Sequence, residues 1–183
     1  NVDNIATVLT NDANLLNQEN QAYMQNSAQV RSSGNIGGKL IESANILATN
    51  IIISAGNDFN NIASNIDSTG DASITAVNNV NITTAKLRNA GEYIGKNYVK
   101  ITDEVKNIAS EIFIGGDLTV NAGNDALIKG SDILVAGNFG IIAGDELNII
   151  SAEDSYYHFE KTKKKGGWGK KSSVAITIDN INN

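Results

Sequence analysis

The sequence predicts an all-β protein, a parallel β-helix with rungs of about 21 residues and β-hairpin excursions. Three observations support this prediction. A 43-residue unit occurs twice, at 43–85 and 110–152, with an offset of 67 residues. Within each unit similar residues recur 21 apart, as Ala55 and Ala76 do. Apolar and polar residues alternate around them, the two-residue period of a half-buried strand. Strands that recur at a fixed spacing pair with the same strand of the next repeat, which stacks them into a solenoid.

Eight apolar residues mark the strand before a corner in each rung. We expect them to stack along the interior: Ile53, Ala55, Ile74, Ala76, Val120, Ala122, Ile141 and Ala143. Gly, Asn and Asp follow them, and these residues tolerate the positive φ of sharp corners. An antiparallel sandwich would also show short alternating strands, but it gives no reason for identical spacing in the two copies.

The repeat predicts one β-helix segment over residues 1–183, which we divide in order. It has a less regular lead-in (1–42), a first two-rung unit (43–85), a first excursion (86–109), a second two-rung unit (110–152), a second excursion (153–176) and the start of the next rung (177–183). The alignment of Ser43–Asp58 on Ser110–Asp125 has no gaps. With neither an initiator Met nor a leader-like start, the chain reads as a segment of a longer protein.

The two excursions are predicted to be hairpins that leave the rungs and return. Their second limbs align at an offset of 75, with Val99 on Val174 and Ile101 on Ile176, so the second excursion is eight residues longer. In the first excursion, apolar residues also recur at steps of three and four, which would suit a helix. Gly91 and the absence of such spacing in the second excursion favour the hairpin.

Composition narrows the function classes. The chain has 27 Asn and 25 Ile but 5% aromatic residues, which indicates a narrow interior. Without Cys there is no disulfide scaffold and no thiolate metal site. No apolar run approaches the length that spans a bilayer. The net charge is −6, and residues other than 161–171 carry 8 basic against 20 acidic groups, so we expect no nucleic-acid partner.

Candidates for catalysis are few. His158 is the only histidine, which leaves no metal cluster and no relay for a nucleophile. A polysaccharide-active β-helix enzyme would need clustered acids, and the candidates are Asp58, Asp125 and Asp145 with Glu146. These acids occupy corner positions, where turn geometry alone favours Asp. We therefore expect no catalytic residue, no metal and no cofactor.

A basic stretch in the second excursion has two interpretations. It consists of Lys161, Lys163, Lys164, Lys165, Trp168, Lys170 and Lys171. Lysines around a tryptophan suit an anionic membrane or lipopolysaccharide. A solvated tip with flexible glycines explains the same residues without a ligand, and the sequence leaves both interpretations open.

The stretch "AGND…IKGSDILVAGNFGIIAGDELNIISAED", followed by a Lys/Gly/Ser-rich excursion, resembles a known repeat. It is similar to the second type of hemagglutinin repeat in filamentous hemagglutinin and contact-dependent growth-inhibition exoproteins. The resemblance covers roughly residues 36–183 and is most specific over 110–152. It implies a right-handed β-helical filament, secreted to the bacterial cell surface through the outer-membrane transporter of a two-partner system.

The resemblance also implies a role. We expect a structural segment of a growth-inhibition exoprotein that associates with the target-cell outer membrane during toxin delivery. The shaft of a filamentous hemagglutinin-type adhesin, which would meet a host-cell surface, is the alternative within the family. The polysaccharide-active enzyme is the alternative from another class.

Overall fold

A computed structural model describes residues 2–5, 7–10, 30–36, 38–42, 44–167 and 173–182, with side chains from residue 44 on. The chain divides into two compact units. Unit 1 comprises residues 1–8, 40–86 and 107–152, and unit 2 comprises 9–39, 87–106 and 153–183. Among the described residues no helix has the length and hydropathy to cross a bilayer.

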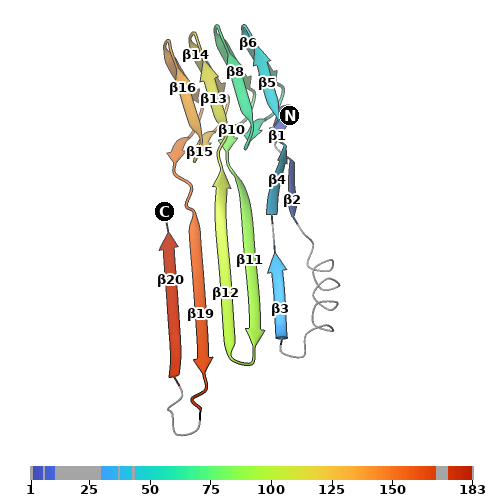
Figure 1. Cartoon of the computed structure of the whole chain (residues 1–183). Helices are drawn as coiled ribbons and strands as arrows, with labels where there is room; N and C mark the ends of the chain where they lie inside the picture. The colour runs from blue at the N-terminus through green and yellow to red at the C-terminus, as the bar shows by residue number, and fades with distance from the viewer. Residues whose placement is uncertain are drawn as a thin grey trace. The chain divides into compact units, whose positions relative to one another are not determined.

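Unit 1 is the predicted parallel β-helix, built from three parallel sheets (Figure 1). The first contains β1 (Val2–Ile5), β7 (Phe59–Ile62), β10 (Val80–Thr83), β15 (Ala126–Lys129) and β18 (Leu147–Ile150). The second contains β5 (Asn45–Ala48), β8 (Asn65–Ser68), β13 (Glu111–Ile114) and β16 (Asp132–Val135). The third contains β6 (Ile51–Ala55), β9 (Ala72–Ala76), β14 (Leu118–Ala122) and β17 (Phe139–Ala143). A separate pair joins β2 (Thr7–Thr10) to β4 (Gly38–Glu42).

Each rung takes one strand from each sheet, and the rungs stack in register across the first excursion. Thr119 of β14 pairs with Ser73 of β9, and Glu111 of β13 pairs with Asn65 of β8. Figure 1 shows β8 and β13 side by side although a hairpin separates them in sequence. Parallel pairing throughout these three sheets confirms the solenoid and excludes the antiparallel sandwich.

The interior of unit 1 is a column of aliphatic side chains. Ile74 is fully buried, and it pairs with Ile53 on one side and with Val120 on the other. Of the eight predicted interior residues, five are buried: Ala55, Ile74, Ala76, Val120 and Ala122. The other three pack against the core while partly exposed: Ile53, Ile141 and Ala143. All eight lie in the third sheet, in matching register.

The gap-free alignment of the first rung is wrong by one residue in β5. Asn45 pairs with Asn65, which pairs with Glu111, so Asn45 corresponds to a residue 66 positions later rather than 67. Alternation has a period of two, and a slip of one residue exchanges the two faces of a strand. The observed register packs Ile46 against the core and leaves Leu47 75% exposed.

Two corners of the rungs carry ladders of side-chain oxygens. At the corner after the second sheet, Asn50 Oδ1 accepts a hydrogen bond of 2.9 Å from the Asp71 N–H, and Asp71 Oδ1 accepts one of 2.9 Å from the Asp117 N–H. Asp117 Oδ1 continues the ladder to the Asn138 N–H at 2.7 Å. Each carbonyl or carboxylate thus satisfies a backbone donor of the next rung, as turn residues must.

The third corner is buried and polar. The Ser110 hydroxyl shares its one proton between the Asn61 carbonyl at 3.0 Å and the Thr83 carbonyl at 2.8 Å, so it joins chain segments on both sides of the first excursion. At the same corner Ala63 has a φ of +49°, and Gly130, 67 residues later, has a φ of +53°. The two rungs therefore make this turn with a left-handed residue at the same position.

Unit 2 is one antiparallel sheet with the order β20-β19-β12-β11-β3 (Figure 1). Its strands are β3 (Val30–Ile36), β11 (Ala85–Gly95), β12 (Tyr98–Ile108), β19 (Ser155–Lys164) and β20 (Ser173–Asn182). The first excursion is therefore a hairpin and not a helix. Residues 177–182, where we expected the next rung to begin, still pair with β19. Within the predicted lead-in, Val2–Ile5 already pairs with Phe59–Ile62 as a rung strand.

Candidate functional site

The corner acids that could have formed a catalytic groove are spread over three rungs of the solenoid, as Asp58, Asp125 and the pair of Asp145 and Glu146. Asp58 Oδ1 accepts a hydrogen bond of 3.2 Å from the Asn79 N–H, and Asp125 Oδ1 accepts one of 3.2 Å from the Glu146 N–H. The Asp145 N–H donates to the Asn124 carbonyl at 2.9 Å. In the part of the chain that the structure describes, no three His, Cys, Asp or Glu side chains could share a metal ion. The geometry of these acids is that of a structural ladder.

His158 lies on one face of β19 between two polar neighbours. Its Nδ1 is 3.3 Å from the Tyr156 hydroxyl, and its Nε2 is 3.6 Å from Glu160 Oε2. Thr102 and Asp179 lie directly opposite on the flanking strands. This face also pairs Lys100 with Glu160 and Glu104 with Tyr156, so it is largely polar.

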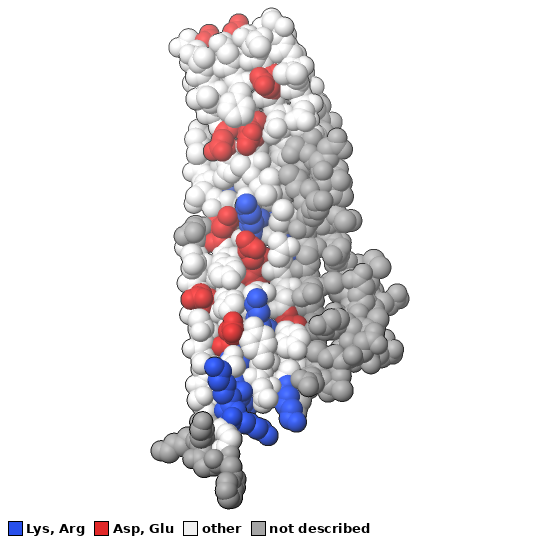
Figure 2. All heavy atoms as spheres, in the orientation of Figure 1, with Lys and Arg blue, Asp and Glu red and all other residues white. Residues whose placement is uncertain are grey.

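The predicted basic stretch begins at the end of β19. Lys161, Lys163 and Lys164 are in the strand, and Lys165 follows it. Lys163, Lys164 and Lys165 are exposed, and Lys161 is partly exposed. Trp168, Lys170 and Lys171, which we assigned to the same contact, lie outside the described residues. Figure 2 shows basic side chains gathered at the end of unit 2, while acidic side chains prevail over unit 1.

Apolar side chains surround two of these lysines. Residues directly opposite in an antiparallel sheet share a face. Lys161 lies between Val99 and Ile176, and Lys163 lies opposite Val174. The next row of the same face contains Ile101, Phe159 and Ile178. We call the set of Val99, Ile101, Phe159, Lys161, Lys163, Val174, Ile176 and Ile178 the mixed face.

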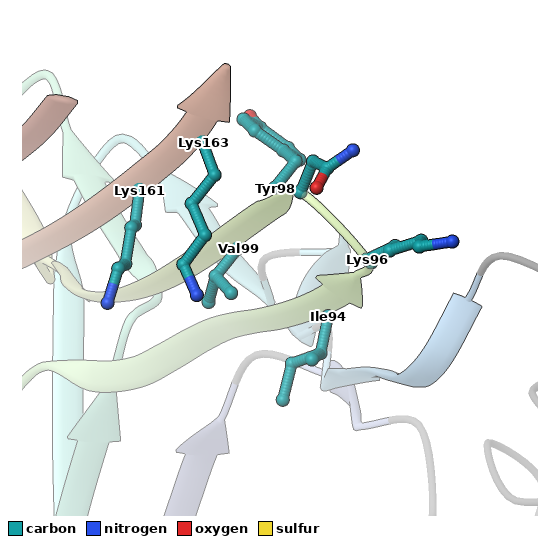
Figure 3. Close-up of a pocket in the computed structure, with 8 residues that line it drawn as sticks. Ile94, Lys96, Tyr98, Val99, Lys161 and Lys163 are labelled. Atoms are coloured by element: carbon teal, nitrogen blue, oxygen red, sulfur yellow. The ribbon is translucent and has the colours of Figure 1, made fainter. Parts of the chain in front are cut away.

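The turn of the first hairpin adds to this end of the sheet. A cleft of about 180 Å³ is lined by residues 94–99 together with Lys161 and Lys163. In Figure 3 both lysine side chains point to one side of the sheet, as Val99 and Ile94 do, while Lys96 points away from them. The Lys163 N–H donates 2.7 Å to the Asn97 carbonyl, which fastens β19 to that turn. Sequence reasoning did not find residues 94–99, because only the strand pairing brings them to the lysines.

The opposite faces of this sheet therefore differ in chemistry. Val174, Ile176 and Ile178 are each more than half exposed on the mixed face, and each lies beside a lysine or an aromatic residue. The other face presents Tyr156, His158 and Glu160. An exposed sheet with apolar and basic side chains on one side can lie against an anionic, partly apolar surface.

Comparisons with known proteins agree with this architecture. The family model described as Hemagglutinin repeat matches residues 95–182. The tRNA nuclease CdiA of Escherichia coli (strain STEC_O31) is 27% identical over 130 residues, which is 64% of this chain and 4% of that protein. The tRNA nuclease CdiA of Burkholderia pseudomallei is 32% identical over 162 residues, 74% of this chain and 12% of that protein.

A further relative is the 16S rRNA endonuclease CdiA of Enterobacter cloacae, which is 26% identical over 142 residues, 70% of this chain and 4% of that protein. The chain thus spans a small part of the length of each of these three relatives. No solved structure matches it. Residues 95–182 therefore belong to the hemagglutinin repeat family, and the chain is a structural repeat segment of a large exoprotein of the growth-inhibition or filamentous hemagglutinin type, which is secreted to the bacterial cell surface.

Proposed function

We propose that this chain is a non-catalytic segment of a contact-dependent growth-inhibition exoprotein, in which the rungs build the shaft and the hairpin sheet contacts the target-cell outer membrane. The outer-membrane transporter of a two-partner system would export the parent protein. The observation that carries the membrane role is the mixed face, where Lys161 and Lys163 lie among exposed Val174, Ile176 and Ile178.

Charge and apolar area both favour an anionic membrane as the ligand. A lysine near an anionic leaflet contributes roughly 1 kcal/mol of binding free energy. Together the four lysines of this stretch therefore contribute several kcal/mol: Lys161, Lys163, Lys164 and Lys165. Long lysine stems can lie along apolar surface while their ammonium groups reach phosphates. The chain as a whole is acidic, with a net charge of −6, which disfavours a nucleic acid and restricts the contact to this end.

The corner acids support the proposal that the segment is non-catalytic. Asp58 and Asp125 each accept a backbone hydrogen bond from the next rung, and they lie on separate turns of the solenoid. A polysaccharide lyase or hydrolase needs two or more carboxyl groups converging on one bound sugar. The arrangement supports rung stacking instead.

Vesicle binding tests the membrane role. Wild-type protein should co-sediment with vesicles of phosphatidylcholine and lipopolysaccharide, and binding should weaken with added salt because exposed charges are screened. Replacement of Lys161, Lys163, Lys164 and Lys165 by Ala should reduce binding at least about tenfold, since several kcal/mol of attraction are removed.

A matched control removes the same charge elsewhere. Lys86, Lys100, Lys106 and Lys129 are outside both the mixed face and the basic stretch at residues 161–165, and their replacement by Ala should leave vesicle binding within about twofold. Equal loss in both quadruple variants would show a nonspecific charge effect. A wild-type protein that does not bind these vesicles would overturn the membrane role.

The apolar part of the face has its own test. Val174→Ser, Ile176→Ser and Ile178→Ser keep the charge and remove the exposed aliphatic groups of β20. We expect this triple variant to bind the vesicles several-fold more weakly, and its remaining binding to become more sensitive to salt. Unchanged affinity would mean that the lysines act alone.

A further inference from the structure

Lys161 and Lys163 form a pair of cations without an anionic partner. They lie two residues apart on β19, so their Cα atoms are about 7 Å apart and their side chains leave the same face of the sheet. Among the described residues neither lysine forms an ion pair. The cross-strand neighbours of Lys161 on this face are the apolar Val99 and Ile176. Two like charges beside apolar groups repel each other, and a bound anion would relieve that repulsion.

The turn of the first hairpin forms the other wall of the cleft beside these lysines. Residues 94–99 line the cleft together with Lys161 and Lys163, its volume is about 180 Å³, and none of these lining residues is acidic. Figure 3 shows Ile94 and Val99 on the side of the sheet to which both lysines point. The cleft is smaller than the roughly 300–1,000 Å³ of sites for drug-sized ligands, so it suits a single small anionic group.

Contacts that need no ligand hold this turn in place. The rings of Tyr93 and Tyr98 lie 5.7 Å apart with an interplanar angle of 52°. The Lys163 N–H donates a hydrogen bond of 2.7 Å to the Asn97 carbonyl, which joins the turn to β19. All the lining residues belong to β11, β12, β19 and the turn between the first two, and these three strands lie inside the sheet. The cleft is therefore formed before an anion binds, and it does not involve the edge strand β20.

We infer that this cleft is a binding site for a phosphate monoester, held by Lys161 and Lys163. A monoester carries a charge of about −1.5 to −2 at pH 7, which two lysines balance, whereas a phosphodiester carries only one charge. Each lysine binds phosphate as a point charge with three N–H donors, so the two can share its terminal oxygens. This assignment rests on the proposed function, because it names the lipid group that the mixed face recognises. It makes the membrane contact selective among anionic lipids.

Vesicles of equal surface charge separate a phosphate site from general attraction. One set contains phosphatidylcholine with phosphatidic acid, which is a monoester. The other contains phosphatidylcholine with enough phosphatidylglycerol, a diester, to give the same zeta potential. Attraction to the surface potential alone would make both sets bind equally. We expect the wild-type protein to bind the phosphatidic acid vesicles at least about fivefold more tightly.

Two double variants remove the same charge inside and outside the cleft. Lys161→Gln/Lys163→Gln changes lysines that line it, while Lys164→Gln/Lys165→Gln changes neighbours that do not. The first variant should bind the two sets of vesicles within about twofold of each other. The second should bind both sets more weakly and keep the preference for phosphatidic acid. Loss of the preference in both variants would overturn the inference.

Glycerol 3-phosphate, added without vesicles, distinguishes a free phosphate ester from a lipid headgroup. It should shift the amide NMR signals of residues 94–99, Lys161 and Lys163, whereas glycerol should not. Tighter binding to phosphatidic acid vesicles than to glycerol 3-phosphate would identify the ligand as a lipid, and equal binding would identify it as a soluble ester. Absence of these shifts, or equal binding to both sets of vesicles, refutes the phosphate site and leaves the membrane role intact. Shifts in a protein that binds neither set refute the membrane role and leave the site intact.

Discussion

Asp71 Oδ1 accepts a hydrogen bond of 2.9 Å from the N–H of Asp117, a residue 46 positions later in the chain. The bond joins the corners of two neighbouring rungs that the first excursion separates in sequence. Asn50 and Asn138 occupy the same ladder in other rungs, so both Asp and Asn satisfy its geometry. The ladder requires a short side chain with an oxygen acceptor, whatever its charge.

Asp71→Ala should destabilise unit 1 by about 1 kcal/mol, because the Asp117 N–H loses its acceptor at an exposed corner. Asp71→Asn keeps an acceptor oxygen and should change stability by less than about 0.5 kcal/mol. Urea unfolding followed by far-UV circular dichroism measures both. Equal destabilisation by the two substitutions would show that the carboxylate charge is what matters.

Ile74→Ala should cost about 2–5 kcal/mol, because it leaves a cavity between the rungs of Ile53 and Val120. Ile52→Ala is the matched control, since Ile52 is 83% exposed on the same sheet while Ile74 is fully buried. We expect the control to stay within about 0.5 kcal/mol of wild type in the same urea titration. A large effect of Ile52→Ala would contradict the assignment of inner and outer faces.

Gly130→Ala should destabilise the third corner by about 2 kcal/mol or more, because the left-handed conformation and the crowding both add cost. A Cβ there would come within 2.5 Å of Ala152 Cβ and 2.9 Å of Thr84 Cγ2. Gly140→Ala, in β17, meets no atom within 4 Å and serves as the control. Thermal unfolding compares the two variants, and similar melting temperatures would refute the constraint at Gly130.

The ion pair of Arg88 and Asp103 predicts a pH dependence. The Arg88 guanidinium donates hydrogen bonds of 2.9 and 2.7 Å to the Asp103 carboxylate and lowers the pKa of Asp103 below its usual 3.8. Because the pKa of Asp103 is lower in the folded than in the unfolded protein, the contribution of the ion pair to folding stability is complete above about pH 4. This contribution is lost as the pH falls through the pKa of the folded state.

Asp103→Asn should therefore make the urea midpoint less dependent on pH below about pH 4, and both proteins should show similar slopes near neutral pH. The pair is largely exposed, so the effect should be small and should diminish with salt. An unchanged acid slope in the variant would mean that the pair does not contribute to folding.

The rungs could be predicted from sequence because two signals coincide. The 21-residue spacing of Ala55 and Ala76 and the period-two alternation both survive in the structure. The register of β5 could not be predicted, because Ile46 and Leu47 are both apolar and either could face the core. The corner between β5 and β6 is one residue shorter than the same corner in later rungs, and this difference sets the register of β5.

The candidate site was only partly predictable. Lys161 and Lys163 were singled out by composition, but their apolar neighbours Val99 and Ile176 come from other strands. Pairing between successive hairpins creates the mixed face, and cross-strand register leaves no local signal in sequence. The corner ladder of Asn50, Asp71, Asp117 and Asn138 did have a signal, since these residues recur at the rung spacing.

The pairing of rungs across the first excursion is the most direct test of the solenoid. Ser73 and Thr119 are paired in register on parallel strands. Neighbouring strands are about 4.8 Å apart, within the range of Cα separations that a disulfide spans. The Ser73→Cys/Thr119→Cys protein should form an intramolecular disulfide under mild oxidation. Ser73→Cys/Asn121→Cys, shifted by two residues, should form it at least about tenfold more slowly. A faster reaction in the shifted pair, or no disulfide in the first, would contradict the parallel β-helix.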